Sequence, residues 1–294
     1  MIYDCFTFFN ELDLLEIRLN VLNNVVDKFV LVEATKTHQG NEKSLIYNEN
    51  KQRFSAFSDK IIHVIVDKFP DTESDLAWTL ERYQRNMIAE GLKNCKAEDI
   101  ILISDIDEIP DPVKINRYKD KKGIKIFLQH MFYYFLNCKN ATLQENFRWP
   151  GTVMVRFDEF ISPQYYRDLS IAVTGFYSPR LIIRWYVKFN FYRRILVRGK
   201  RVIFVEDGGW HFSYLGGVQA IIKKLEAFAH TEYNTSQYKN AESIEDAINK
   251  GKDIFGRDFQ YKFVPLDNTY PDYIKDNSSK FEHLIKSLDH VVQK

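Results

Sequence analysis

Two acids follow an apolar run in the segment ILISDIDEIPDP at residues 101–112. One residue separates Asp105 from Asp107, and alternate side chains of an extended chain point to the same side. Two carboxylates placed in this way can bind one hard divalent cation, such as Mn²⁺ or Mg²⁺, or its water shell. Pro110 and Pro112 then end the strand. A polar turn at a strand end has the same composition, so the motif alone leaves both interpretations open.

The motif also has an interpretation as part of a phosphohydrolase. Haloacid-dehalogenase-like phosphatases follow an apolar strand with Asp-x-Asp, and Asp105 would then be the nucleophile. Those enzymes usually carry Thr or Val two residues further on, in a motif near the N-terminus. This chain has Ile109 followed by Pro110, about 100 residues into the sequence. The difference favours a metal site over a phosphatase.

The elements that must position these acids alternate between strands and helices. Four apolar runs in the first part of the chain predict buried strands, at Tyr3–Phe9, Lys28–Glu33, Ile61–Val66 and Asp99–Ser104. Apolar residues at spacings of three and four predict helices between them, at Glu11–Leu22 and Ser74–Leu92. This alternation indicates an α/β fold with a mainly parallel central sheet. In such sheets ligands bind beyond the carboxyl ends of the strands, which is where the two acids would lie.

The second half of the chain is more elaborate. Residues 124–137 and 152–157 predict further strands, and the residues that follow Gly216 predict an amphipathic helix. Because no linker-like stretch separates the halves, we expect a single domain over residues 1–294, with halves at 1–122 and 123–294.

A basic and aromatic stretch, RLIIRWYVKFNFYRRILVRGKR, occupies residues 180–201. One interpretation is a pair of strands with one basic, solvated face. The alternative is a peripheral contact with an anionic membrane surface or an acidic glycan. Lys and Arg (41) nearly balance Asp and Glu (40) over the whole chain. Nucleic acid is therefore not an expected partner.

The cysteines fit either a reducing compartment or simply buried thiols. Three cysteines, Cys5, Cys95 and Cys138, form neither a disulfide framework nor a zinc spacing. The start MIYDCFTFF lacks the basic segment of a signal peptide. No apolar run reaches the roughly 18–20 residues that span a bilayer. From these features we expect a cytoplasmic protein without a transmembrane segment.

Several long blocks occur in the order found in a known family. They are DCFTFFNELDLLEIRLNVL, VDKFVLVEATKTHQG, ERYQRNMIAEGL, ILISDIDEIP, GGWHFSYLGG and KLEAFAHTEYN. With them the chain resembles glycosyltransferase family 17 from about Tyr3 to Leu284. The resemblance implies a GT-A-type nucleotide-sugar-binding fold. It also implies a donor-binding half at 1–122 and an acceptor-side half at 123–294.

The resemblance assigns roles to individual residues. The Asp-x-Asp would hold Mn²⁺ or Mg²⁺ against the donor diphosphate, and a late histidine would complete the metal shell. These three are Asp105, Asp107 and His211, although a structural role for His211 is equally open. Further donor contacts are expected from arginines and an asparagine on one helix and from strand ends, namely Arg82, Arg85, Asn86, Phe9, Asn10, Glu11 and Glu33. Trp149 and Trp210 are candidate platforms for the acceptor sugar.

The reaction implied is an inverting transfer from a UDP-sugar, expected to be UDP-GlcNAc, to a glycan hydroxyl, forming a β-linkage. Such a transfer needs a base that deprotonates the acceptor hydroxyl. We expect Asp207 in this role, with Glu108, Glu206 and Glu232 as the other candidates. A glycan-binding module that has lost catalysis is a further alternative to the enzyme.

Overall fold

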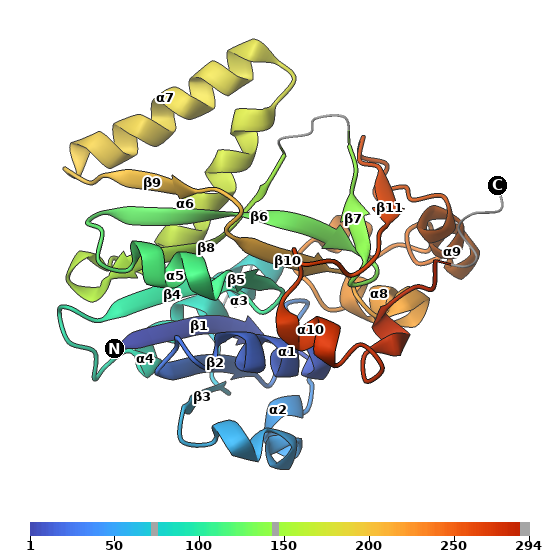
Figure 1. Cartoon of the computed structure of the whole chain (residues 1–294), viewed down its shortest axis with the longest axis horizontal. Coiled ribbons are helices and arrows are strands. Elements are labelled where there is room, and N and C mark those ends of the chain that lie inside the picture. The colour runs from blue at the N-terminus through green and yellow to red at the C-terminus, as the bar shows by residue number, and fades with distance from the viewer. Residues whose placement is uncertain (72–75, 143–146, 289–294) are drawn as a thin grey trace.

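The structure of the protein is a computed structural model, which describes residues 1–71, 76–142 and 147–288. Its centre is an 11-stranded sheet formed by these described residues (Figure 1). Four parallel strands make up one side of this sheet, in the order β4-β1-β2-β3. They are β1 (Ile2–Phe8), β2 (Lys28–Ala34), β3 (Ile61–Val66) and β4 (Ile100–Asp105). The sequence predicted an α/β fold with a mainly parallel central sheet; the α/β fold is confirmed, and these four strands form the parallel side of the sheet.

The helices between these strands lie where the periodicity placed them. Helix α1 (Leu12–Leu22) connects β1 to β2, and α3 (Leu76–Asn86) with α4 (Ile88–Gly91) precedes β4. The helix expected over Ser74–Leu92 begins outside the described residues and is divided between α3 and α4 at Met87. Short helices α2 (Ile46–Glu49) and η1 (Lys51–Phe57) precede β3.

The C-terminal half extends the same sheet with mixed pairings. Strand β8 (Trp149–Arg156) runs antiparallel to β4 and to β6 (Ile124–Tyr133), which joins the two halves. Strand β9 (Val202–Val205) is parallel to β6, and β10 (Gly209–Ser213) pairs with both β6 and β5 (Glu108–Pro110). The remaining elements are β7 (Cys138–Asn140), β11 (Tyr261–Phe263), α5 (Pro112–Tyr118), α6 (Pro163–Thr174), α8 (Gly217–Leu225), α9 (Ala241–Asn249), α10 (Asp272–Asp276) and the 3-10 turns η2 (Phe157–Glu159), η3 (Gly175–Tyr177), η4 (Thr231–Tyr233) and η5 (Glu282–Leu284).

The structure corrects the prediction made from sequence for residues 180–201. The strand pair proposed there is wrong, because the structure forms one long helix, α7 (Leu181–Val197), at the outer edge of the molecule (Figure 1). Phe191 and Ile195, four residues apart, are buried on the side that faces the body. The aromatic and β-branched content suits a strand, but the spacing of the buried residues is helical. Packing on one face therefore overrides the residue propensities.

A buried ion pair ties the parallel strands to the acidic loop. Arg18, on α1, is fully buried and donates to both carboxylate oxygens of Asp4 at 2.7 and 2.8 Å. Its other N–H groups reach the backbone carbonyls of Asp105, Ile106 and Glu108 at 2.9 to 3.1 Å. One guanidinium thus fixes the path of the chain directly after β4. Among the described residues, no helix is both long and apolar enough to cross a membrane.

Candidate active site

A cavity of about 1090 Å³ opens at the carboxyl ends of the parallel strands. Its walls come from the residues that directly follow three of these strands, including Phe9 after β1, Lys36 after β2 and Asp107 after β4. Helices α3, α6 and α8 contribute the remaining sides. This is the edge at which open α/β sheets bind their ligands, so the cavity is the candidate active site.

Asp105 lies between two arginines in this cavity, of which Arg85 is buried and Arg167 is half-buried. Arg85 Nη2 donates to its Oδ1 at 2.9 Å, and Arg167 Nη2 donates to its Oδ2 at 2.6 Å. Burial alone would raise the pKa of Asp105, but Arg167 and Arg85 outweigh it and lower this pKa to about 2. Asp105 is therefore ionised at neutral pH, and both of its oxygens already accept charged hydrogen bonds.

The Glu108 side chain is fully buried and lies outside the lining of the cavity. Its Oε1 accepts from Trp149 Nε1 at 2.6 Å and from Arg167 Nη1 at 2.7 Å. Its Oε2 accepts from the backbone N–H of Asp105 at 3.0 Å. Because three donors satisfy this carboxylate, its position favours holding Arg167 and Trp149 in place over taking up a proton from a substrate.

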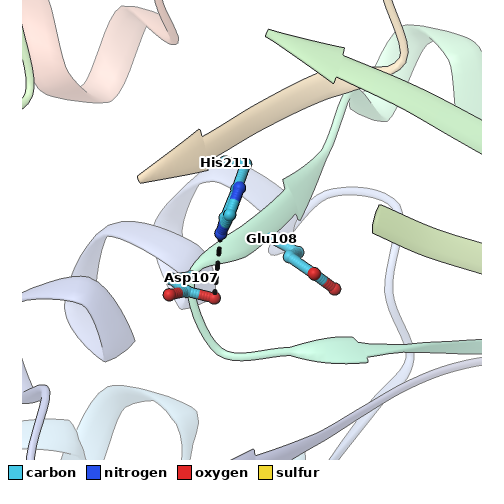
Figure 2. Close-up of side chains that lie close together, drawn as sticks. All are labelled: Asp107, Glu108 and His211. Atoms are coloured by element: carbon cyan, nitrogen blue, oxygen red, sulfur yellow. Dashed lines mark ion pairs between the residues drawn. The ribbon is translucent and has the colours of Figure 1, made fainter. Parts of the chain in front are cut away.

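Asp107 faces a histidine and a lysine. Its Oδ2 accepts from Lys224 Nζ at 3.2 Å, and its Oδ1 lies 3.7 Å from His211 Nε2. Figure 2 shows the imidazole directed from β10 towards this carboxylate. Burial opposes ionisation, yet the Lys224 ammonium and then His211 hold the pKa of Asp107 well below its ordinary value. The same pairing raises the pKa of Lys224.

The register of the sheet brings His211 to the acids. Strand β10 pairs antiparallel with β5, which sets His211 opposite Glu108. The backbone N–H of Phe212 donates to the carbonyl of Asp107 at 2.8 Å. Gly209, at the start of β10, has φ +136°, and a Cβ there would lie 2.2 Å from the carbonyl oxygen of Ile109. The close approach of strands β10 and β5 therefore requires glycine at this position.

Asp107, Glu108 and His211 form a group whose ligand atoms lie within 4.8 Å of one another. Glu108 is held by its three donors, so Asp107 and His211 are the side chains that fit a cation best. Two ligands that each lie about 2.1 Å from one ion are themselves separated by roughly 3–4 Å, which matches the 3.7 Å between them. His211 Nδ1 is buried without a hydrogen-bond partner among the described residues, so its ring has unused bonding capacity.

The other predicted donor residues divide into two groups. Phe9, Glu11 and Arg82 line the cavity together with Arg85. The Glu11 carboxylate accepts from the backbone N–H groups of Phe9 and Asn10, which shapes the turn after β1.

Three predicted donor residues lie outside the cavity lining. Asn10 forms part of the turn after β1. Glu33 is fully buried and accepts from the backbone N–H of Tyr47, with the His63 ring nitrogen 3.0 Å away. The Asn86 side chain accepts from the backbone N–H of Gln164, which ties α3 to α6.

The two tryptophans predicted for the acceptor have different settings. Trp149 lines the cavity and stacks on the ring of His211, with 4.7 Å between the ring centroids. Trp210 is 9% exposed, belongs to the core and donates from Nε1 to the carbonyl of Thr269. The structure therefore brings Trp149 to the site and places Trp210 in the core.

The predicted base Asp207 lies outside the lining of the cavity. Its side chain is 60% exposed, and its Oδ1 is 3.1 Å from His130 Nε2. Among the other acids considered as the base, Glu232 has its Oε1 2.7 Å from His230 Nδ1. His230 itself lines the cavity. A histidine with a carboxylate partner thus stands at the wall of the site.

Sequence reasoning missed two cations of the site. Arg167 comes from α6 and is 62 positions from Asp105, and Lys224 comes from α8 and is 117 positions from Asp107. Arg167 stands outside the blocks that carry the family resemblance, whereas Lys224 is the first residue of the block KLEAFAHTEYN, where no role was assigned to it. Lys224 lies in the helix that the sequence predicted, so its helical context was visible although its partner was not.

Residues 1–168 match the family model described as Glycosyltransferase family 17. The matched part is more than half of the chain, and the chain belongs to glycosyltransferase family 17. The resemblance drawn from the sequence blocks is thereby confirmed.

Relatives in mammals extend the match beyond this region. The rat β-1,4-mannosyl-glycoprotein 4-β-N-acetylglucosaminyltransferase is 25% identical over 298 residues, which cover 95% of this chain and 53% of the relative. The human protein of the same name is 25% identical over 296 residues, which cover 94% of this chain and 53% of the human protein. The chain spans about half the length of the curated relatives it matches.

Solved structures show more distant likenesses. A mannosyltransferase from Pyrobaculum calidifontis, in complex with GDP-Man and Mn²⁺, has a TM-score of 0.39 and 12% identity, covering 87% of this chain and 66% of that one. The glucosyl-3-phosphoglycerate synthase of M. tuberculosis has a TM-score of 0.32 and 11% identity, covering 72% and 71%. At these TM-scores the two structures carry no weight in the assignment of the site.

Proposed function

We propose that this chain is a metal-dependent, inverting glycosyltransferase of the GT-A type. It would move a sugar from a UDP-sugar, expected to be UDP-GlcNAc, to a glycan hydroxyl and form a β-linkage. Family membership and the names of the mammalian relatives support sugar transfer. The observation that carries the proposal is the set of three cations, Arg85, Arg167 and Lys224, which line one cavity beside Asp105 and Asp107.

The three cations suit a diphosphate. Guanidinium groups bind phosphate oxygens in a fixed geometry, and a lysine adds a compact charge. Asp105 fixes both arginines at 2.6 and 2.9 Å, so their orientation is set before a ligand arrives. Because they are held in this way, the arginines would stabilise the negative charge that grows on the leaving diphosphate.

Asp107 and His211 would hold the divalent cation in this proposal. Mn²⁺ or Mg²⁺ bound there would add positive charge beside the diphosphate. Asp105, which the sequence placed with the metal ligands, would act mainly through the two arginines that occupy its oxygens. Lys224 shares the Asp107 carboxylate, so the cation and this ammonium would both contribute to holding the donor.

The catalytic base has two candidates that a single comparison separates. Asp207 stays the prediction from sequence, whereas the geometry favours His230, which lines the cavity and has Glu232 as its partner at 2.7 Å. If His230 is the base, His230→Gln lowers kcat at least a hundredfold while Asp207→Asn retains activity. The reverse pattern would restore Asp207 to this role.

Donor binding is the test of the proposal as a whole. Titration calorimetry with UDP, with and without Mn²⁺, should show binding that strengthens with the metal. Asp107→Asn and His211→Gln should each weaken the metal-dependent part of UDP binding at least tenfold, whereas Asp120→Asn, which changes an exposed acid just after α5 that lies outside the cavity lining, should not. If the wild-type chain binds no UDP-sugar and shows neither hydrolysis nor transfer with the common donors, the proposal is wrong.

The two alternatives predict different results in the same experiments. A phosphohydrolase would turn over an aryl phosphate in a manner abolished by Asp105→Asn, but both oxygens of Asp105 are bound by arginines, which disfavours a nucleophile. A glycan-binding module would retain sugar binding after Asp107→Asn and after chelation of metal. The cytoplasmic location stays a prediction, and fractionation of the source cells would test it.

A further inference from the structure

Helix α7 carries an apolar stripe on the face that points away from the body. Ile182, Trp185, Tyr186 and Phe189 follow the helical spacing i, i+3, i+4, i+7 and are 85%, 75%, 69% and 67% exposed. Leu196 continues the stripe two turns further on. Soluble proteins rarely leave so many large side chains of one helix in water, and such patches mark interaction surfaces.

The opposite face of α7 is already used for packing. Phe191 and Ile195 are buried against the body. Phe176 of η3 contacts Phe191 edge to face, with 5.2 Å between the ring centroids. The helix is therefore anchored through one side, and the exposed stripe is not needed to hold the fold together. Figure 1 shows α7 lying along the outside of the molecule beyond β9.

The segment that carries the stripe has basic residues and no acid. Between Asp168 and Glu206 the sequence has no acid and eight basic residues, which are Arg180, Arg184, Lys188, Arg193, Arg194, Arg198, Lys200 and Arg201. A second copy of the chain would bring the same charges face to face, which disfavours a dimer through this helix. The charge is complementary to an anionic surface, and Trp and Tyr are the residues preferred at the interface between lipid and water.

A small cavity beside the C-terminal end of α7 fits an anionic group. It has a volume of about 230 Å³ and is lined by Tyr165, Asp168, Leu169, Arg194 and Arg198. The Arg198 guanidinium lies over the ring of Tyr165 at 4.9 Å from its centroid. The buried Tyr165 hydroxyl has no hydrogen-bond partner among the described residues. Two guanidinium groups against one carboxylate leave this cavity net positive, as a phosphate would require.

We propose that α7 is an interfacial helix that binds the surface of an anionic lipid membrane. The stripe would enter the boundary between headgroups and acyl chains, and the arginines and lysines would contact lipid phosphates. The segment that leads into α7 also lines the active-site cavity, through Tyr177, Ser178 and Pro179. Membrane binding would thus hold the mouth of that cavity close to the lipid surface.

Cosedimentation with lipid vesicles tests this proposal without any measurement of enzyme activity. The wild-type chain should bind vesicles that contain phosphatidylglycerol at least tenfold more tightly than vesicles of phosphatidylcholine alone, and added salt should weaken this binding. The double variant Trp185→Ser with Phe189→Ser should bind at least tenfold more weakly. The charge variant Arg193→Glu with Arg194→Glu should also lose at least tenfold.

Matched controls separate a specific surface from general effects. Val113→Ser removes an apolar residue that is 70% exposed elsewhere, and Lys250→Glu with Lys252→Glu reverses two exposed charges beside α9, at the opposite end of the molecule from α7 (Figure 1). Both controls should bind vesicles as the wild type does. Circular dichroism and urea unfolding should be unchanged in every variant, because the substituted side chains lie in solvent.

Three results would overturn the proposal. The first is failure of the wild-type chain to bind phosphatidylglycerol vesicles. The second is equal binding by the Trp185 and Phe189 double variant. The third is a thermal shift by inorganic phosphate without vesicle binding, which would make the small cavity a site for free phosphate. Since none of these measures sugar transfer, they leave the proposed enzyme activity to its own test.

Discussion

Replacing Arg167 with methionine tests whether the acidic loop is held by charge. Arg167 donates to Asp105 Oδ2 at 2.6 Å and to Glu108 Oε1 at 2.7 Å, and its side chain is 14% exposed. Removing one partner of a buried ion pair typically costs about 3–5 kcal/mol. Asp105 keeps Arg85 and Glu108 keeps two neutral donors. We therefore expect the lower value, about 3 kcal/mol.

Urea unfolding followed by tryptophan fluorescence measures this loss directly. In a protein of 294 residues a loss of about 3 kcal/mol also lowers Tm by about 5 °C. Arg156→Met is the matched control, because Arg156 pairs with Asp158 at the surface, where both side chains are about 40% exposed. That pair should contribute less than about 1 kcal/mol.

The pH dependence of the loss identifies its cause. In the wild type Arg167 and Arg85 hold the pKa of Asp105 at about 2. Without Arg167 this pKa moves towards its ordinary value, so the folded variant takes up the proton at a higher pH than the folded wild type does. Acid therefore removes less stability from the variant, and the difference in stability between the two should shrink as pH falls below about 4. A loss no larger than that of Arg156→Met, or one that does not change with pH, would refute the electrostatic account.

Three further outcomes are expected from the same contacts. Arg18→Met should lower the free energy of unfolding, measured with urea, by about 3–5 kcal/mol, because it leaves the buried Asp4 carboxylate and three backbone carbonyls without their hydrogen-bond donor. The double variant with Asp4→Asn should recover part of this loss. Protonation of Asp105 should remove about 2 kcal/mol of stability between pH 4 and 2, since its folded pKa is about 2 against an ordinary 3.8, and in a pH series of unfolding curves Asp105→Asn should lose less stability over this range than the wild type. Gly209→Ala should cost at least about 2 kcal/mol and lower Tm, because φ is +136° and the added methyl would meet the Ile109 carbonyl; an unchanged Tm would contradict this.

Consecutive residues allowed much of the fold to be predicted. The strand ending at Asp105 lies within one apolar run, and its neighbours β1, β2 and β3 lie within one residue of the predicted ranges. Such runs are visible because strands buried on both faces need apolar residues at every position. The same reasoning gave a wrong prediction of strands for the segment that forms α7. Its aromatic and β-branched residues favour a strand, while the contacts of Phe191 and Ile195 with the body are long-range and select a helix.

The sequence placed at the candidate site its two acids and other residues that line the cavity, among them Arg85 and Trp149, but not Arg167 or Lys224. Asp105 and Asp107 are two positions apart at a recognisable strand end, and His211 stands in a block with family resemblance. The proximity of His211 to Asp107 depends on the pairing of β10 with β5, which no local pattern contains. Trp149 and Trp210 look alike in sequence, yet one lines the cavity and the other lies in the core.

The sequence alone determined the α/β class, the family and the acidic end of β4, because each is written in residues that are close together along the chain. The tertiary structure decided which charges meet those acids. Arg167 reaches Asp105 across 62 positions and Lys224 reaches Asp107 across 117, through the packing of α6 and α8 against the sheet. Contacts over such separations depend on the register of the strands and the placement of the helices, and no single stretch of sequence encodes either.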